Sequence, residues 1–121
     1  MFDAIEPGGT SVVCIQPKPL VSTKMIQRVV AEYYNYSVAD MIGPSRSPRV
    51  SWVRQIAMTI LYHYRKKEGD IYSWGYKRTA QAFHRRDHTT ARHGIKKIER
   101  IALTNVELQL ELAEIRQKLG L

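Results

Sequence analysis

The sequence predicts an all-α fold: a helix-turn-helix bundle of about five to six helices with a basic loop. Apolar residues recur at helical spacing in segments that Gly, Pro, Ser and Asn separate. Within residues 77–103, a short helical segment, a tight turn and a second helical segment follow one another, which is the order of a helix-turn-helix. The basic side chains gather in the middle of the chain. We expect two parts, a flexible N-terminal arm over residues 1–21 and one domain over residues 22–121.

Length and composition bound the class of protein. The chain has 121 residues, 44% of them hydrophobic, which suits one globular domain with a modest core. No apolar run is long enough to span a membrane, and the first residues, MFDAIEPGGTSVV, lack the regions of a signal peptide. Residues 1–21 show no periodicity and leave room only for a short strand around Ser11–Ile15. The single cysteine, Cys14, cannot form an internal disulfide, so we expect an intracellular, reducing compartment.

The net charge of +8 is unevenly distributed. Residues 1–43 hold three basic and four acidic side chains, a net −1, and residues 101–121 hold two and three, again −1. Residues 44–100 hold fourteen basic and four acidic side chains, a net +10. This concentration indicates a polyanionic partner, either nucleic acid or an anionic membrane surface.

The first helices lie before the basic region. Ser22 or Thr23 can cap the first helix, because apolar residues then recur at helical spacing as far as Tyr33. A short second helix is expected over residues 38–42. The segment GPSRSPRV at residues 43–50 contains two prolines and two arginines, which predicts a stiff, exposed, basic loop.

Four helical segments follow in the rest of the chain. An amphipathic helix is expected from Ser51 to about Lys67. An aromatic connector, residues 69–76, leads to a short helix from about Lys77 to Phe83. A helix from His88 to about Leu103 comes next, and a last helix runs from about Asn105 to Leu119. The residues expected to face the core are Val53, Ile56, Ala57, Ile60, Leu61, Tyr64, Ala80, Phe83, Ala91, Ile95, Ile98, Ala102, Leu108, Leu112, Ile115 and Leu119.

Residues 85–100, RRDHTTARHGIKKIER, carry the chemistry. In a helix-turn-helix the N-terminal end of the second helix enters the major groove of DNA and reads base edges. Asp87 is expected to cap this helix, and it can also accept a hydrogen bond from a cytosine amino group. Threonine methyls can meet thymine methyls, and histidine nitrogens can donate to purine acceptors. The residues of these types are Thr89, Thr90, His88 and His93.

RRDHTTARHGIKKIER resembles the signature of the C-terminal DNA-binding domain of the bacterial chromosomal replication initiator family, DnaA. The resemblance extends upstream to VAEYYNYSVADMI and VRQIAM, so it covers about residues 23–103. It implies sequence-specific binding to short A·T-rich boxes in double-stranded DNA. It also implies that Arg46, in the basic loop, enters the adjacent minor groove and that Gln55 contacts a phosphate.

The residues and the resemblance together define two sets of contacts, to bases and to the phosphate backbone. The expected base-contacting residues are Arg46, Asp87, His88, Thr89 and His93. The expected phosphate-contacting residues are Arg49, Gln55, Lys77, Arg85, Arg86, Thr90, Arg92 and Lys97.

The chain departs from the family pattern at several positions. Arg92 stands where the family usually has an apolar core residue, so either the helix is rotated or Arg92 adds a phosphate contact. His84 and Arg85 replace a glycine pair in the turn, which stiffens it and adds charge. Pro48 and Trp52 replace residues that are commonly basic in the family.

Full-length members of the family carry an ATPase module with a phosphate-binding loop, and no GxxxxGK[ST] string occurs here. We expect a freestanding DNA-binding regulator, encoded by a phage or another mobile element, that is cytoplasmic and nucleoid-associated and is not an enzyme. Its expected partner is double-stranded DNA, with no cofactor, metal, membrane or small-molecule substrate. The alternative is a protein-interaction module that recruits a replication or transcription protein, through the arm or an apolar stripe. That stripe consists of Leu108, Leu112, Ile115 and Leu119.

Overall fold

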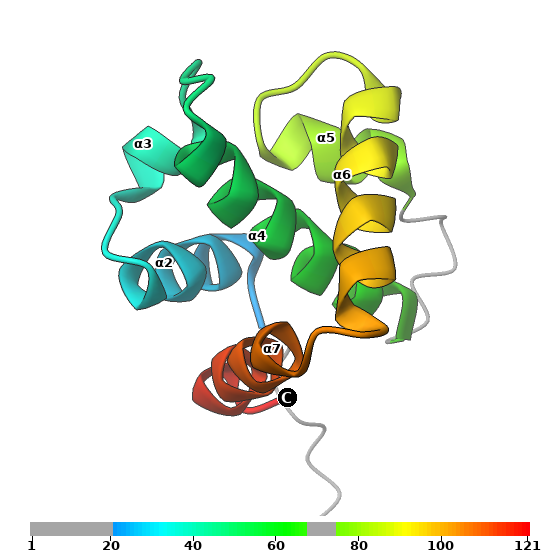
Figure 1. Ribbon diagram of the computed structural model, residues 1–121. Coiled ribbons are helices and arrows are strands. Elements are labelled where there is room, and N and C mark those ends of the chain that lie inside the picture. Colours follow the sequence, from blue (N-terminus) through cyan, green and yellow to red (C-terminus); the bar gives the residue numbers. More distant parts are fainter. Residues whose placement is uncertain (1–20, 68–74) are drawn as a thin grey trace, which may run out of the picture.

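The computed structural model describes residues 21–67 and 75–121, and every regular element in these ranges is an α-helix (Figure 1). The predicted all-α fold is confirmed. The N-terminal arm, the short strand around Ser11–Ile15 and most of the aromatic connector lie outside the described residues. The helices are α2 (Thr23–Tyr33), α3 (Val38–Ile42), α4 (Pro48–Lys67), α5 (Tyr76–Ala82), α6 (His88–Ala102) and α7 (Val106–Leu119).

Short polar side chains set where the helices begin. The Ser22 Oγ atom accepts a hydrogen bond from the Met25 amide at 3.1 Å, and Ser37 Oγ accepts one from the Asp40 amide at 3.0 Å. Asn105 caps α7 by accepting from the Leu108 amide at 3.0 Å. Each cap satisfies one of the amide groups that have no partner in the first turn of a helix. The predicted helix starts near residues 22 and 105 are therefore confirmed.

The start of α4 was predicted wrongly. The basic loop was expected over residues 43–50, but α4 begins at Pro48, so the loop is shorter and Arg49 lies in the first helical turn. Proline suits this position, since its fixed φ matches the helix and the first turn does not need its amide. The loop between α3 and α4 is therefore residues 43–47, and we refer to these residues as the basic loop.

Helix α4 is the central element of the fold. It contacts α2, α3, α5, α6 and α7, and in Figure 1 it crosses the molecule between α2 and α6. This explains why its buried surface is wider than an amphipathic pattern requires, and why Met58 and Thr59 are buried as well. The Thr59 hydroxyl donates to the Gln55 carbonyl at 2.8 Å, so its burial leaves no unpaired donor. The predicted core residues of α4 are all buried: Val53, Ile56, Ala57, Ile60, Leu61 and Tyr64.

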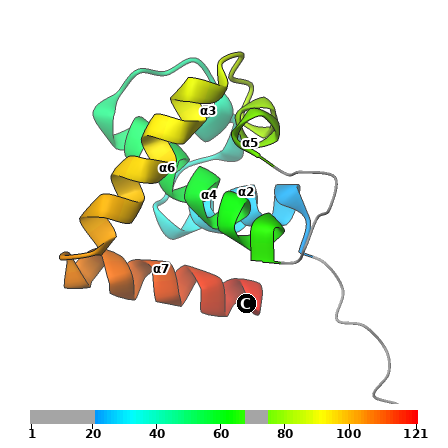
Figure 2. The same ribbon diagram turned by 90° about the vertical axis from the view of Figure 1, so that its right-hand side faces the viewer.

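Helix α7 closes the side of the domain opposite the basic loop (Figure 2). Its apolar stripe of Leu108, Leu112, Ile115 and Leu119 is buried in the common core. The Tyr34 hydroxyl donates to Glu111 at 2.6 Å, and the Tyr33 hydroxyl donates to Glu114, so α2 and α7 are also tied by polar contacts. Because the stripe is covered by this chain itself, it is not available to recruit another protein.

Among the described residues, no helix is both long and apolar enough to cross a membrane.

Candidate nucleic-acid interface

The turn between α5 and α6 has a fixed geometry. Phe83 is the first residue of this turn, and its side chain is completely buried in the core, as predicted. His84 follows with φ 58, in the left-handed region that glycine adopts without strain. The Arg85 amide then donates to the Ala80 carbonyl at 2.8 Å and turns the chain towards α6. A histidine therefore occupies the left-handed position at some cost in backbone strain.

Asp87 is the N-cap of α6, as predicted. Its carboxylate accepts from the Thr89 amide at 2.9 Å. Hydrogen bonding from Thr89 lowers the pKa of Asp87, with smaller contributions from the charges of His88 and His93. The carboxylate is therefore ionised at neutral pH and acts only as an acceptor. Asp87 is exposed, so its carboxylate is accessible from solvent while it caps the helix.

Helix α6 presents a polar face opposite its core-facing side. Ala91, Gly94, Ile95 and Ile98 are buried, while Ala102 is half-buried rather than fully buried. Arg92 is exposed, so the helix is not rotated and Arg92 joins the outward cations. Thr89 is half-buried, at the edge of the outward face. The remaining predicted contact residues on this helix and its cap are all exposed: Asp87, His88, Thr90, Arg92, His93 and Lys97.

The basic loop lies on the same side of the molecule as the turn before α6, at the upper edge of both ribbon views (Figures 1 and 2). Arg46 is an exposed residue of this loop. A direct contact joins the loop to the turn, since the Arg85 guanidinium donates to the Gly43 carbonyl at 2.8 Å. The structure thus brings together the loop expected in the minor groove and the helix end expected in the major groove.

Arg54 holds the basic loop in place, a role that the helical pattern did not predict. It is 6% exposed, and its guanidinium donates to the carbonyls of Met41 at 2.8 Å, Gly43 at 3.3 Å and Ser45 at 3.0 Å. Burial lowers the pKa of Arg54, and the nearby charge of Arg85 adds to this effect. The only available signal was a charged residue among the core positions of VRQIAM.

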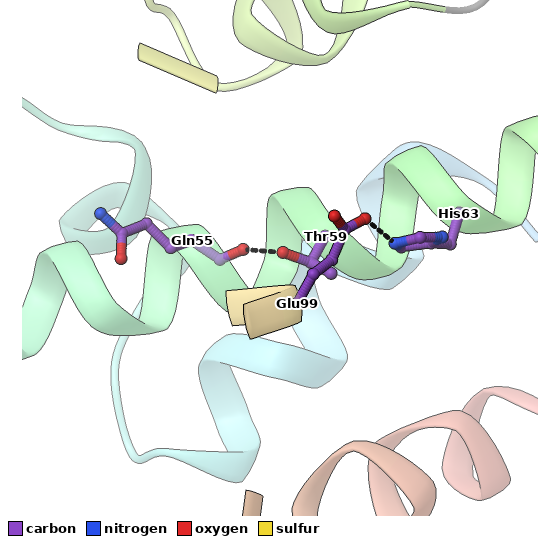
Figure 3. A network of polar contacts seen from close by, with 4 residues as sticks. All are labelled: Gln55, Thr59, His63 and Glu99. Carbon is purple, nitrogen blue, oxygen red and sulfur yellow. Dashed lines mark hydrogen bonds and ion pairs between the residues drawn. The ribbon is translucent and has the colours of Figure 1, made fainter. Parts of the chain in front are cut away.

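Gln55 lies where α4 and α6 pack together. It is half-buried, and its Oε1 atom is buried without a hydrogen-bond partner among the described residues. Gly94 of α6 leaves room for it, because a Cβ atom at Gly94 would lie 2.8 Å from Gln55 Cγ. Further along the same helix pair, His63 Nε2 lies 2.6 Å from Glu99 Oε2 (Figure 3). The Gln55 side chain therefore packs between α4 and α6. Its predicted phosphate contact requires that the amide group extend beyond this helix contact.

The remaining predicted phosphate contacts come from three helices and from the turn before α6. Lys77 and Arg86 are exposed in the first turn of α5 and in the turn before α6, and Arg49 is exposed at the start of α4. The Lys97 ammonium lies 5.9 Å from the ring centroid of Trp52, within range of a cation–π interaction. Trp52 is half-buried against the core, in agreement with a packing role.

Within residues 21–67 and 75–121, no group of three or more His, Cys, Asp or Glu side chains is placed to hold a metal ion. His84 and His88 both lie near the turn, but the group facing His88 is the capping carboxylate of Asp87, at 3.8 Å.

Comparison with known proteins gives a consistent result. Residues 23–98 match the family described as bacterial dnaA protein helix-turn-helix. Three relatives named chromosomal replication initiator protein DnaA, from Cereibacter sphaeroides, Ruegeria pomeroyi and Roseobacter denitrificans, are 35%, 34% and 33% identical to this chain over 99 residues. These matches cover 82% of this chain and 20% of each relative. The chain therefore spans about one fifth of the length of the relatives it matches.

Proposed function

Because the chain belongs to the family of bacterial DnaA helix-turn-helix domains, which bind double-stranded DNA, we propose that it recognises short A·T-rich duplex boxes. In this proposal α6 lies in the major groove and the basic loop lies in the adjacent minor groove. The observation that carries it is the contact between Arg85 and Gly43, which holds the two elements side by side. A domain that works in this way is located at the nucleoid and acts as a regulator by occupying its boxes.

Base recognition in the major groove is assigned to the capped end of α6. His88, Thr89 and His93 lie on or beside its outward face, and Asp87 adds an ionised acceptor. Imidazole N–H groups can donate to purine N7 or O6, the threonine methyl can contact a thymine methyl, and the carboxylate can accept from a cytosine N4. The amide groups at the helix start also favour a phosphate nearby.

Minor-groove recognition is assigned to Arg46. The minor groove narrows in A·T-rich sequence, which strengthens its negative potential and attracts an arginine. Arg46 is exposed on a short loop whose carbonyls at residues 43 and 45 are held by Arg54. A guanidinium presented from such a fixed loop loses less conformational freedom on binding than one on a mobile segment.

Phosphate contacts supply the affinity in this proposal. They are assigned to cations and polar groups around the two reading elements. If about five to eight phosphates are neutralised, the logarithm of the binding constant falls with the logarithm of salt concentration at a slope of about −5 to −7. The residues assigned to phosphate are Arg49, Gln55, Lys77, Arg85, Arg86, Thr90, Arg92 and Lys97.

Fluorescence anisotropy with an A·T-rich initiator-type box and a shuffled duplex, across a salt series, tests the proposal. The box should be preferred at about 0.15 M salt, where long-range attraction is largely screened. Equal, steeply salt-dependent binding to both duplexes would refute recognition of the box, and absence of binding would refute the assignment to DNA.

Two matched variants separate base reading from phosphate binding on the same helix. His93→Ala should weaken binding to the box by about 1–3 kcal/mol and reduce discrimination against variant boxes. Lys97→Ala should weaken binding to all duplexes evenly and make the salt slope shallower by about 0.9. Arg116→Ala, on the exposed surface of α7 away from both reading elements, is the control and should leave affinity unchanged. An even loss from His93→Ala would contradict its base-reading role.

A further inference from the structure

The Gly43 carbonyl is shared by two arginines that come from different parts of the chain. Arg54 of α4 donates a hydrogen bond to this carbonyl at 3.3 Å, and Arg85, in the turn before α6, donates one at 2.8 Å. Arg54 also holds the carbonyls on either side, at Met41 and Ser45. Four hydrogen bonds from two guanidinium groups therefore fix the segment that leads into Arg46.

We propose that Arg54 and Arg85 are positioning residues that clamp the basic loop to the turn before α6, so that minor-groove and major-groove recognition are energetically coupled. This inference rests on the proposed function, because it assumes that Arg46 reads the minor groove. It replaces the phosphate contact that the proposed function assigns to Arg85, because the Arg85 guanidinium is already directed at the Gly43 carbonyl. Arg85 acts on DNA through Arg46, by holding the loop at a fixed separation from α6.

Three features of the site support a clamp rather than a chance contact. The Arg54 side chain is buried, and a buried guanidinium must direct its N–H groups at acceptors, which here are carbonyls of residues 41–45. Hydrogen bonds from a charged donor are about twice as strong as those between neutral groups. Gly43 also has no space for a side chain, since a Cβ atom there would lie 2.8 Å from the Ala39 carbonyl oxygen. The carbonyl that both arginines share thus belongs to a residue whose position is tightly defined.

The repulsion between the two cations indicates that the surrounding structure holds them together. Two guanidinium groups that share one carbonyl repel each other, and Arg54 is additionally desolvated. Such a contact persists only if the surrounding structure holds it, as α4 and the buried Phe83 do here. Arg85 lies next to His84, whose left-handed backbone directs the turn towards the loop.

A double-mutant cycle on DNA binding tests the clamp, with the A·T-rich box used as the probe. Arg46→Ala and Arg85→Met are compared alone and together, and each single change should weaken binding by about tenfold. If Arg85 acts through Arg46, the double variant should bind no more than about twofold more weakly than Arg46→Ala. Arg86→Met is the matched control, because Arg86 is an exposed neighbour whose loss of affinity should multiply with the loss caused by Arg46→Ala.

The outcomes separate the clamp from the proposed function. If Arg46→Ala has no effect on the box, minor-groove recognition is refuted, and the clamp is refuted with it. If Arg46→Ala weakens binding and the loss of affinity from Arg85→Met multiplies fully with it, only the clamp is refuted. A salt slope that is shallower by about 0.9 for Arg85→Met in the Arg46→Ala background would identify Arg85 as a direct phosphate contact.

A measurement on the free protein tests the clamp without DNA. Arg85→Met should speed hydrogen exchange at the Ser47 amide, which donates to Ser45 Oγ within the loop at 3.2 Å, while amides in the middle of α4 remain protected. Arg54→Lys is the companion variant, since it keeps the charge but not the planar set of donors. It should also loosen the loop amides, in a protein that still unfolds cooperatively. Unchanged exchange in both variants would overturn the proposal.

Discussion

Gly94 allows α4 and α6 to approach closely, and this contact gives a prediction whose size follows from the structure. In the interior of a helix, alanine is favoured over glycine by about 1 kcal/mol. The added Cβ would lie 2.8 Å from Gln55 Cγ, however, well inside the normal separation of two carbon atoms. Relieving such overpacking costs about 1–3 kcal/mol. Gly94→Ala should therefore lower the free energy of unfolding by up to about 2 kcal/mol, in spite of its better helix propensity.

Urea denaturation of four proteins isolates this contact: the original chain, Gly94→Ala, Gln55→Ala and the double variant. Gln55→Ala removes Cγ, so Gly94→Ala should stabilise that background by about 1 kcal/mol. The coupling free energy between the two sites should then be about 1–3 kcal/mol. If Gly94→Ala stabilises both backgrounds equally, the close packing of Gln55 on Gly94 is refuted.

Three further predictions concern single groups. His84→Gly should raise the free energy of unfolding by up to about 0.5 kcal/mol, because relief of the left-handed backbone at His84 outweighs the greater freedom of glycine in the unfolded chain. A fall of more than about 1 kcal/mol in the free energy of unfolding would contradict this. Hydrogen bonding to Glu114 raises the pKa of Tyr33 from 10 to about 12, so its stabilisation is complete below pH 10 and is lost as the pH rises through about 12. Tyr33→Phe should flatten the decline of stability over that range, measured by thermal melting, and an unchanged slope would exclude this contribution. Glu99→Gln removes the carboxylate that lies 2.6 Å from His63 Nε2. The His63 and Glu99 side chains are 44% and 37% exposed, so a loss above about 1 kcal/mol in urea denaturation would contradict so weak a contact.

The order and type of the helices could be predicted because their signals are local. Periodic apolar residues and short polar caps lie within a few positions of one another, as at Asn105 and along the stripe that ends at Leu119. The same holds for α6, where Asp87 caps the helix and Ala91, Ile95 and Ile98 face inwards. Caps and apolar periodicity depend on the local geometry of the helix and not on which element packs against it. The structure confirms both for these helices.

The start of α4 was missed because its signal has two meanings. Proline ends or prevents a helix in most positions, and Pro48 follows a run of Gly, Pro, Ser and Arg. The same residue is favourable in the first turn, where the structure places it. Only the packing of Val50, which is 8% exposed, shows that the helix already faces the core at this point.

The role of Arg54 could not be predicted, since its partners lie on a separate segment. A charged residue beside Val53 in a helical pattern is normally expected at the surface. Its burial becomes favourable only when the chain between α3 and α4 presents three carbonyl groups to it. The contact between Gln55 and Gly94 is hidden for a similar reason, because the two residues are 39 positions apart.

Arg54 and Gln55 are consecutive residues of α4 that serve the two reading elements separately. The Arg54 side chain holds the basic loop, and the Gln55 side chain packs on α6. Helix α4 therefore sets the distance between the two elements before DNA is present, and DNA binding does not have to create it. Thr89 and His93, in contrast, lie at or on the face of α6 away from its buried side. Under the proposed function, substitutions there should change the preferred base in the major groove without moving Arg46, whereas a substitution that shifts α4 should disturb recognition in both grooves at once.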